Sequence, residues 1–197
     1  MNHFPARFWS VTILILAAML TLALPASAGY RDYAHGLVGS LPKGAVLRPD
    51  LEELLDEMAS GYRSGRSRAP LEASDMLREA ARAQAIDNMR RGKSSHRSNR
   101  GEEFGTRFSA YVDDADLYPA RGENAASDRH DDAADEAKAR RLFKLWLDSS
   151  GHRRNLMSRD YEFVSTGVIQ RGNELWAVQI FWSKPREPGS KSIFQIQ

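Results

Sequence analysis

The chain has 197 residues, with 28 Lys and Arg against 26 Asp and Glu, a net charge of +2, and no cysteine. Such a balanced charge does not suit a general nucleic-acid binder, so we expect no nucleic acid among its partners. The lack of cysteine excludes thiol catalysis and a disulfide scaffold, so the fold must depend on a packed core.

Residues 1–28 have the layout of a secretory signal peptide. Arg7 is the only Lys or Arg in this segment, an apolar run follows it to Leu24, and Ala26-Ser27-Ala28 supplies small residues before a cleavage site. A membrane anchor is the alternative, because the apolar run is nearly long enough to span a bilayer. Pro25 and the small residues favour cleavage after Ala28, which predicts a secreted or periplasmic protein without a stable membrane span.

The next segment, 29–46, is rich in glycine and shows no hydrophobic period, so we expect an N-terminal arm there and one domain over 47–184. A first helix should begin at the N-cap Asp50, with Glu53 three residues on. The apolar residues that follow at helical spacing are Leu51, Leu54, Leu55, Met58 and Tyr62.

Alanines at helical spacing predict a second helix over 74–91 that packs closely on another element and ends at Gly92. A polar, irregular stretch should run over 93–121. Within it, the basic run 90–100 is interpreted first as a solvated loop and second as an anion-binding lip.

A third helix is predicted over 132–149, with Gly151 as its stop and Trp146 in its apolar stripe. Two strand-like runs, 162–170 and 174–182, should form a hairpin. The tail 185–197 is rich in breakers and should be flexible. Helices followed by a hairpin indicate an α+β fold with helices covering a small antiparallel sheet.

The candidate chemistry rests on His96, His152 and Glu123. Each histidine lies close to a predicted helix end, and Glu123 lies in the turn-like segment "RGENAAS". Two imidazoles and a carboxylate brought together could bind a divalent metal such as Zn²⁺, or share a proton near neutral pH. Spacing does not show that they meet, and caps or surface residues are the alternative. His130, in an acidic run, is expected to be solvated.

Four motifs occur in order: "SSHRSNRGEEFGTRF", "RGENAAS", "LFKLWLDSSGHRRNLM" and "YEFVSTGVIQRGNELWAVQIFW". In this order they resemble the CAP superfamily of cysteine-rich secretory proteins, antigen 5 and pathogenesis-related proteins. The chain is most similar to a cysteine-free bacterial, SCP-like branch, and the resemblance covers about residues 51–182.

The resemblance implies a three-layer α-β-α sandwich with a central cleft that carries His96, Glu123 and His152. Family members carry two histidines and two acidic residues there, and some bind a divalent metal, for which His96 and His152 would be the ligands here. Many eukaryotic members have a second Glu three residues after the helix Trp, where this chain has Ser149. A mechanism that needs two carboxylates therefore lacks support. His152 should face the cleft, held by the turn after Gly151.

Three functions stay open. The first is an exported module whose cleft binds a small-molecule, lipid-like or peptide-like ligand, with or without a divalent metal. The second is a peptidase-like hydrolase that uses His96, Glu123 and His152 on a metal-bound or base-activated water. The third is an envelope interaction protein without cleft chemistry. The missing second carboxylate favours binding over catalysis.

Overall fold

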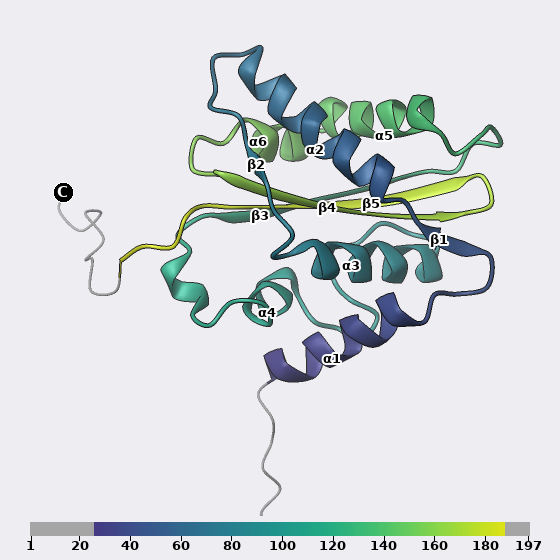
Figure 1. Cartoon of the computed structure of the whole chain (residues 1–197), viewed down its shortest axis with the longest axis horizontal. Helices are drawn as coiled ribbons and strands as arrows, with labels where there is room; N and C mark the ends of the chain where they lie inside the picture. Colours follow the sequence, from purple (N-terminus) through teal and green to yellow (C-terminus); the bar gives the residue numbers. More distant parts are fainter. Residues whose placement is uncertain (1–25, 188–197) are drawn as a thin grey trace, which may run out of the picture.

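The computed structural model describes residues 26–187, which form one sheet between two layers of helices (Figure 1). The elements in chain order are α1 (Ala26–Gly39), β1 (Ala45–Leu47), α2 (Pro49–Ser64), β2 (Glu72–Ala73), α3 (Arg78–Arg91), α4 (Phe104–Ser109), the 3₁₀ helix η1 (Ala115–Leu117), β3 (Arg121–Asp128), α5 (Glu136–Asp148), α6 (Ser150–Met157), β4 (Phe163–Arg171) and β5 (Glu174–Trp182). The predicted α+β class and three-layer α-β-α sandwich are confirmed. No helix within the described residues is long and apolar enough to cross a membrane.

The sheet has the strand order β1-β4-β5-β3, and these neighbours are antiparallel. The short β2 adds a parallel pairing to the outer side of β4. The predicted hairpin is confirmed as β4 and β5, which turn at Gly172 with a φ of 58°. Residues 175–182 of β5 are all buried, because helices cover both faces of this central strand.

Each face of the sheet carries its own apolar core. The helices α1, α3 and α4 cover one face, and α2, α5 and α6 cover the other (Figure 1). The alanines of α3 allow the close packing that the sequence predicts. Where α3 crosses β4, a Cβ on Gly167 would lie 2.2 Å from the backbone nitrogen of Arg82. Only glycine permits this approach.

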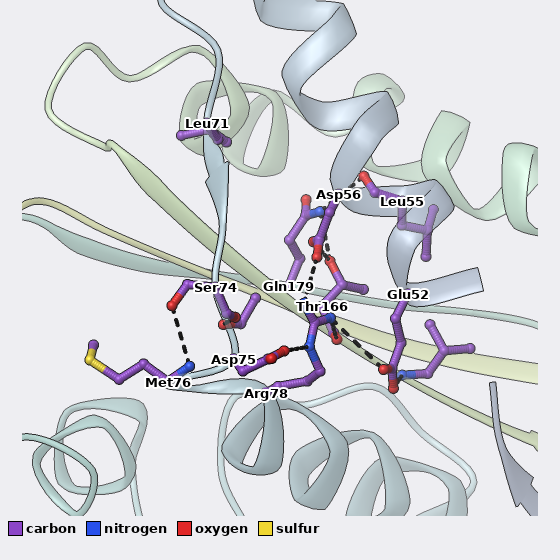
Figure 2. A network of polar contacts seen from close by, with 12 residues as sticks. Glu52, Leu55, Asp56, Leu71, Ser74, Asp75, Met76, Arg78, Thr166 and Gln179 are labelled. Carbon is purple, nitrogen blue, oxygen red and sulfur yellow. Dashed lines mark hydrogen bonds and ion pairs between the residues drawn. The ribbon is translucent and has the colours of Figure 1, made fainter. Parts of the chain in front are cut away.

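A buried network of charged and polar side chains connects the two helical layers around the outer edge of β4 (Figure 2). Glu52 of α2 accepts hydrogen bonds from the guanidinium of Arg82 and from the backbone N–H of Val168. Asp56, one turn further along α2, accepts from Thr166 and pairs with Arg78 at 3.2 Å. Burial raises the pKa of Asp56 to about 6 despite these two favourable contacts.

Arg78 and Glu52 also complete the backbone hydrogen bonding of β4. Arg78 donates to the carbonyl oxygen of Thr166 at 3.0 Å, and Glu52 accepts from Val168 N at 3.1 Å. Between its pairings with β1 and β2, the strand edge is therefore satisfied by side chains rather than by another strand.

The predicted arm over 29–46 is wrong as a description of its structure. The segment from Ala26 to Gly39 is a helix, and Tyr30, Ala34 and Leu37 are buried in the core against α3. These three residues follow helical spacing, which interleaved glycines obscured. Most of the predicted signal segment and of the predicted tail 185–197 lies outside the described residues.

Two predicted helix boundaries also differ. The first helix begins at Pro49 rather than after an Asp50 cap, and Asp50 instead pairs with Arg48. The third helix spans Glu136–Asp148 and is capped by Asp135. Gly151 is not its stop: it lies in the first turn of α6, and the break occurs at Ser149, whose ψ of 121° is extended.

Trp146 is 0% exposed and packs edge-on against Phe143 in the core beneath α5. Truncation in Trp146→Ala should lower the free energy of unfolding by about 3–5 kcal/mol, measured by chemical denaturation. Leu145→Ala is the matched control, because Leu145 lies next to it on the same helix but is 46% exposed. This control should change stability by less than about 1 kcal/mol. Equal effects of the two substitutions would contradict the packing.

Candidate functional site

His96 is positioned by buried polar side chains of α3. Gln84 donates from its amide to the carbonyl oxygens of Ser95 and Arg97, the two neighbours of His96. Asn88 accepts from the backbone N–H of Ser95 at 3.1 Å. Gln84 and Asn88 are both buried, and their hydrogen bonds fix the loop after α3 to the helix. The imidazole of His96 is thereby directed toward Glu123 on β3.

Glu123 lies on β3, not in the turn-like segment that the sequence predicted. Its buried carboxylate accepts from the guanidinium of Arg107 at 2.9 and 2.7 Å and from His96 Nδ1 at 2.8 Å. Arg107 comes from α4, and its side chain is 0% exposed. The positive charge of Arg107 therefore compensates the negative charge of Glu123 inside the protein.

His152 lies in the first turn of α6, three residues after the N-cap Ser149. Ser149, at the position where the resemblance implied a second Glu, caps the helix here: its Oγ accepts from the backbone N–H of His152 at 3.5 Å. Two asparagines attach α6 to β3. Asn124 donates to the carbonyl oxygen of His152 at 3.2 Å, and Asn155 donates to that of Glu123 at 3.2 Å.

The structure brings His96, Glu123 and His152 together at the edge of the sheet. The ring centroids of the two histidines are 6.2 Å apart at an interplanar angle of 68°. Within the described residues, β3 pairs only with β5. His96 follows α3 on one face and His152 begins α6 on the other, so the two rings meet across the outer side of β3.

The environments of the two imidazoles separate their pKa values. The hydrogen bond to Glu123 raises the pKa of His96 above its usual 6.5. Burial, and then repulsion from His96, lower the pKa of His152. The first proton to bind the pair is therefore held by His96, and His152 stays neutral over a wider range of pH.

Only part of a metal-ligand set is present at this site. Among the described residues no group of three or more His, Cys, Asp or Glu side chains is arranged to hold a metal ion. Both oxygens of Glu123 are occupied by Arg107. The donors left for a metal are two imidazole nitrogens, fewer than the three or four protein ligands that zinc sites commonly have.

The other sequence candidates lie elsewhere. His130 contacts Asp128 at the far end of β3, beside a pocket of about 500 Å³ between β3 and α5 that neither His96 nor His152 lines. In the basic run 90–100, Arg97 pairs with Glu103 and Arg100 with Glu102, as expected of a solvated loop.

Sequence reasoning missed Arg107, Asn124 and Asn155. All three lie inside the four ordered motifs, but nothing local distinguishes a buried arginine from an exposed one. Asn155 follows His152 by three residues, so both lie on one side of a helix. That spacing was the available signal for Asn155.

Comparison with known proteins identifies the relationship. The family model described as CAP, the cysteine-rich secretory protein family, matches residues 57–181. The uncharacterised YkwD protein of Bacillus subtilis (strain 168) is 23% identical over 128 residues, which cover 65% of this chain and 46% of that protein. The chain thus spans about half the length of this curated relative.

Two solved structures share the fold. An outer surface protein from Borrelia burgdorferi superposes with a TM-score of 0.60 and 18% identity, over 71% of this chain and 97% of that one. An extracellular protein containing a SCP domain from Bacillus anthracis str. Ames gives 0.56 and 22%, over 74% and 45%. Since the family model matches more than half of its residues, the chain belongs to the CAP, or cysteine-rich secretory protein, family.

Proposed function

We propose that this chain is an exported CAP-domain protein that binds a ligand at His96 and His152, and that binding rather than hydrolysis is its role. The similar structures named as an outer surface protein and an extracellular protein support export. The ion pair between Glu123 and the buried Arg107 is the observation that favours binding over hydrolysis.

A carboxylate can act as a general base only if it can reach and accept a substrate proton. The carboxylate of Glu123 is only 2% exposed and already accepts hydrogen bonds from Arg107 and His96. It is therefore suited to orienting His96 and unsuited to activating water. Ser149, where a second carboxylate would stand, caps α6 instead.

The site favours a ligand that offers a hydrogen-bond donor to the free ring nitrogen of His96, together with some apolar surface. The carboxylate of Glu123 is an acceptor, so Nδ1 of His96 carries the proton, and a neutral ring keeps its lone pair on Nε2. The His96 side chain is 53% exposed and can contact a small-molecule, lipid-like or peptide-like ligand. His152 adds a second, partly buried ring.

A divalent metal at the two imidazoles is a second candidate role. A carboxylate that accepts the Nδ1 proton of a histidine is the usual outer partner of a metal-bound imidazole, and Glu123 has this relation to His96. With two protein ligands, water or the bound ligand itself would have to complete the coordination, so we expect weak binding.

Calorimetric titration of Zn²⁺ at neutral pH tests the metal role. His96→Ala and His152→Ala should each weaken binding by at least about tenfold, because each removes one of two ligands. His130→Ala is the matched control, since His130 lies outside the site, and it should leave the affinity unchanged. Binding should also weaken as the pH falls, and this loss should begin above 6.5, because His96 has the raised pKa and a protonated imidazole has no lone pair to donate. Equal affinities in all four proteins would exclude a shared metal site.

The proton arrangement has its own test, in metal-free protein with a chelator present. A ¹H–¹⁵N NMR titration should give His96 a pKa above 6.5 and His152 a pKa below 6.5. His96→Ala should raise the pKa of His152 by removing the neighbouring charge. If the two rings titrate together, the contact between His96 and Glu123 does not persist in solution.

The rate of substrate cleavage tests the hydrolase alternative. Labelled casein should be cleaved no faster by the wild type with added Zn²⁺ than by a His96→Ala, His152→Ala double variant, because the carboxylate of Glu123 is engaged by Arg107 and His96 and cannot activate water. A rate that falls in the double variant by orders of magnitude would replace binding with hydrolysis as the function.

A further inference from the structure

Three arginines gather around one small pocket that neither His96 nor His152 lines. Arg63 in the last turn of α2, Arg68 in the following loop and Arg159 after α6 line a pocket of about 230 Å³ together with Ser67 and Ala69. We propose that this pocket is a binding site for a phosphate- or sulfate-type oxyanion, free or as part of a larger ligand.

Arg63 places a positive charge inside the protein without a negative partner among the described residues. It is 1% exposed, and its guanidinium donates to four backbone carbonyl oxygens. These are Ala69 O at 2.7 Å, Leu156 O at 3.0 Å, Ser158 O at 2.6 Å and Tyr161 O at 3.2 Å. The carbonyls satisfy its hydrogen bonds but carry no net charge, whereas buried charges are normally paired with an opposite charge.

Part of this arrangement has a structural reason. Leu156 and Ser158 stand at the C-terminal end of α6, where a cation stabilises the helix dipole. That reason accounts for Arg63 alone. It does not account for two further arginines at the same pocket, which repel Arg63; burial and then the charge of Arg68 lower the pKa of Arg63.

No ion pair within residues 26–187 connects this cluster to a carboxylate. The ion pairs found there involve other cations, and none joins Arg63, Arg68 or Arg159 to an acidic side chain. Three positive charges therefore converge on one pocket whose lining residues include no carboxylate.

Arg68 and Arg159 retain donors for a ligand. Arg68 uses only Nε, which donates to the carbonyl oxygen of Met157 at 3.4 Å, so both of its terminal nitrogens remain available. Arg159 is exposed, and its guanidinium makes no hydrogen bond to the described residues. Planar guanidinium groups bind tetrahedral oxyanions through two parallel hydrogen bonds, and they keep their charge at any physiological pH.

The pocket has a suitable size and wall. A water molecule occupies about 30 Å³ in the liquid, so the pocket can hold a five-atom oxyanion together with several waters. Ser67, on the wall, is the one non-glycine residue with positive φ among the described residues, at 55°. Its hydroxyl adds a neutral donor. Arg63 thus contributes a positive electrostatic potential to the pocket, and Arg68, Arg159 and Ser67 supply hydrogen-bond donors.

The test is titration of inorganic phosphate and, separately, sulfate into the full mature chain at low ionic strength. The readout is the amide and guanidinium NMR shifts of residues 63–69 and 159. Arg68→Gln and Arg159→Gln should each weaken binding by about tenfold, the size expected for losing one charge-assisted hydrogen bond. Arg66→Gln is the matched control: it removes the same charge from the same loop, but Arg66 stacks on Tyr62 outside the pocket. Its affinity should change less than about twofold.

Co-sedimentation with vesicles of phosphatidylcholine, with and without phosphatidic acid, separates the sources of the oxyanion. Binding of free phosphate that depends on Arg68 and Arg159 supports a soluble ligand, and binding only to phosphatidic acid vesicles with the same dependence supports a lipid headgroup. A wild type that binds neither probe overturns the site. So does an equal loss in Arg66→Gln, which would indicate general attraction to positive charge. Each variant should keep the wild-type unfolding midpoint. Since this pocket and the histidine pair share no residue, the outcome is independent of the proposed function.

Discussion

The buried ionic network around the outer edge of β4 is the constraint on which the rest of the fold depends. Glu52 and Asp56 reach it from α2, and Arg78 and Arg82 reach it from α3, on the opposite side of the sheet. Removal of one partner from such a network leaves a buried charge uncompensated and typically costs about 3–5 kcal/mol. The network therefore fixes the positions of both helical layers relative to the sheet.

The candidate site depends on the position of both helical layers, because each layer holds one of the two histidines. Gln84 and Asn88 of α3 hold the loop that carries His96, and α6, which carries His152, is attached to β3 through Asn124 and Asn155. A displacement of α3 or α6 relative to the sheet would change the separation of the two imidazoles without altering either residue. The geometry of the site is thus a property of the whole sandwich.

The elements predicted correctly are those with a strong local signal. The β4–β5 hairpin joins two runs rich in β-branched and apolar residues through a glycine turn, and the core of the third helix repeats its apolar residues every three to four positions. The strand β3 was missed because "RGENAAS" is small and polar, and it becomes a strand through eight residues of pairing with β5. The helix α1 was missed because Gly36 and Gly39 weaken its local propensity, which packing on α3 overrides. The order of the motifs predicted that His96, Glu123 and His152 would meet, but the ion pair that defines the role of Glu123 depends on Arg107, from a separate helix.

The position of the two histidines on opposite layers has a consequence for stability. A ligand that contacts both rings would act as a cross-link over the outer side of β3, because its two halves would be anchored to α3 and to α6. Such a ligand binds the folded chain and not the unfolded one, so it stabilises the fold by about 2.7 kcal/mol when present at a hundred times its dissociation constant. A rise in melting temperature would then reveal a ligand whose chemistry is unknown, and the same rise would be absent when either imidazole is removed.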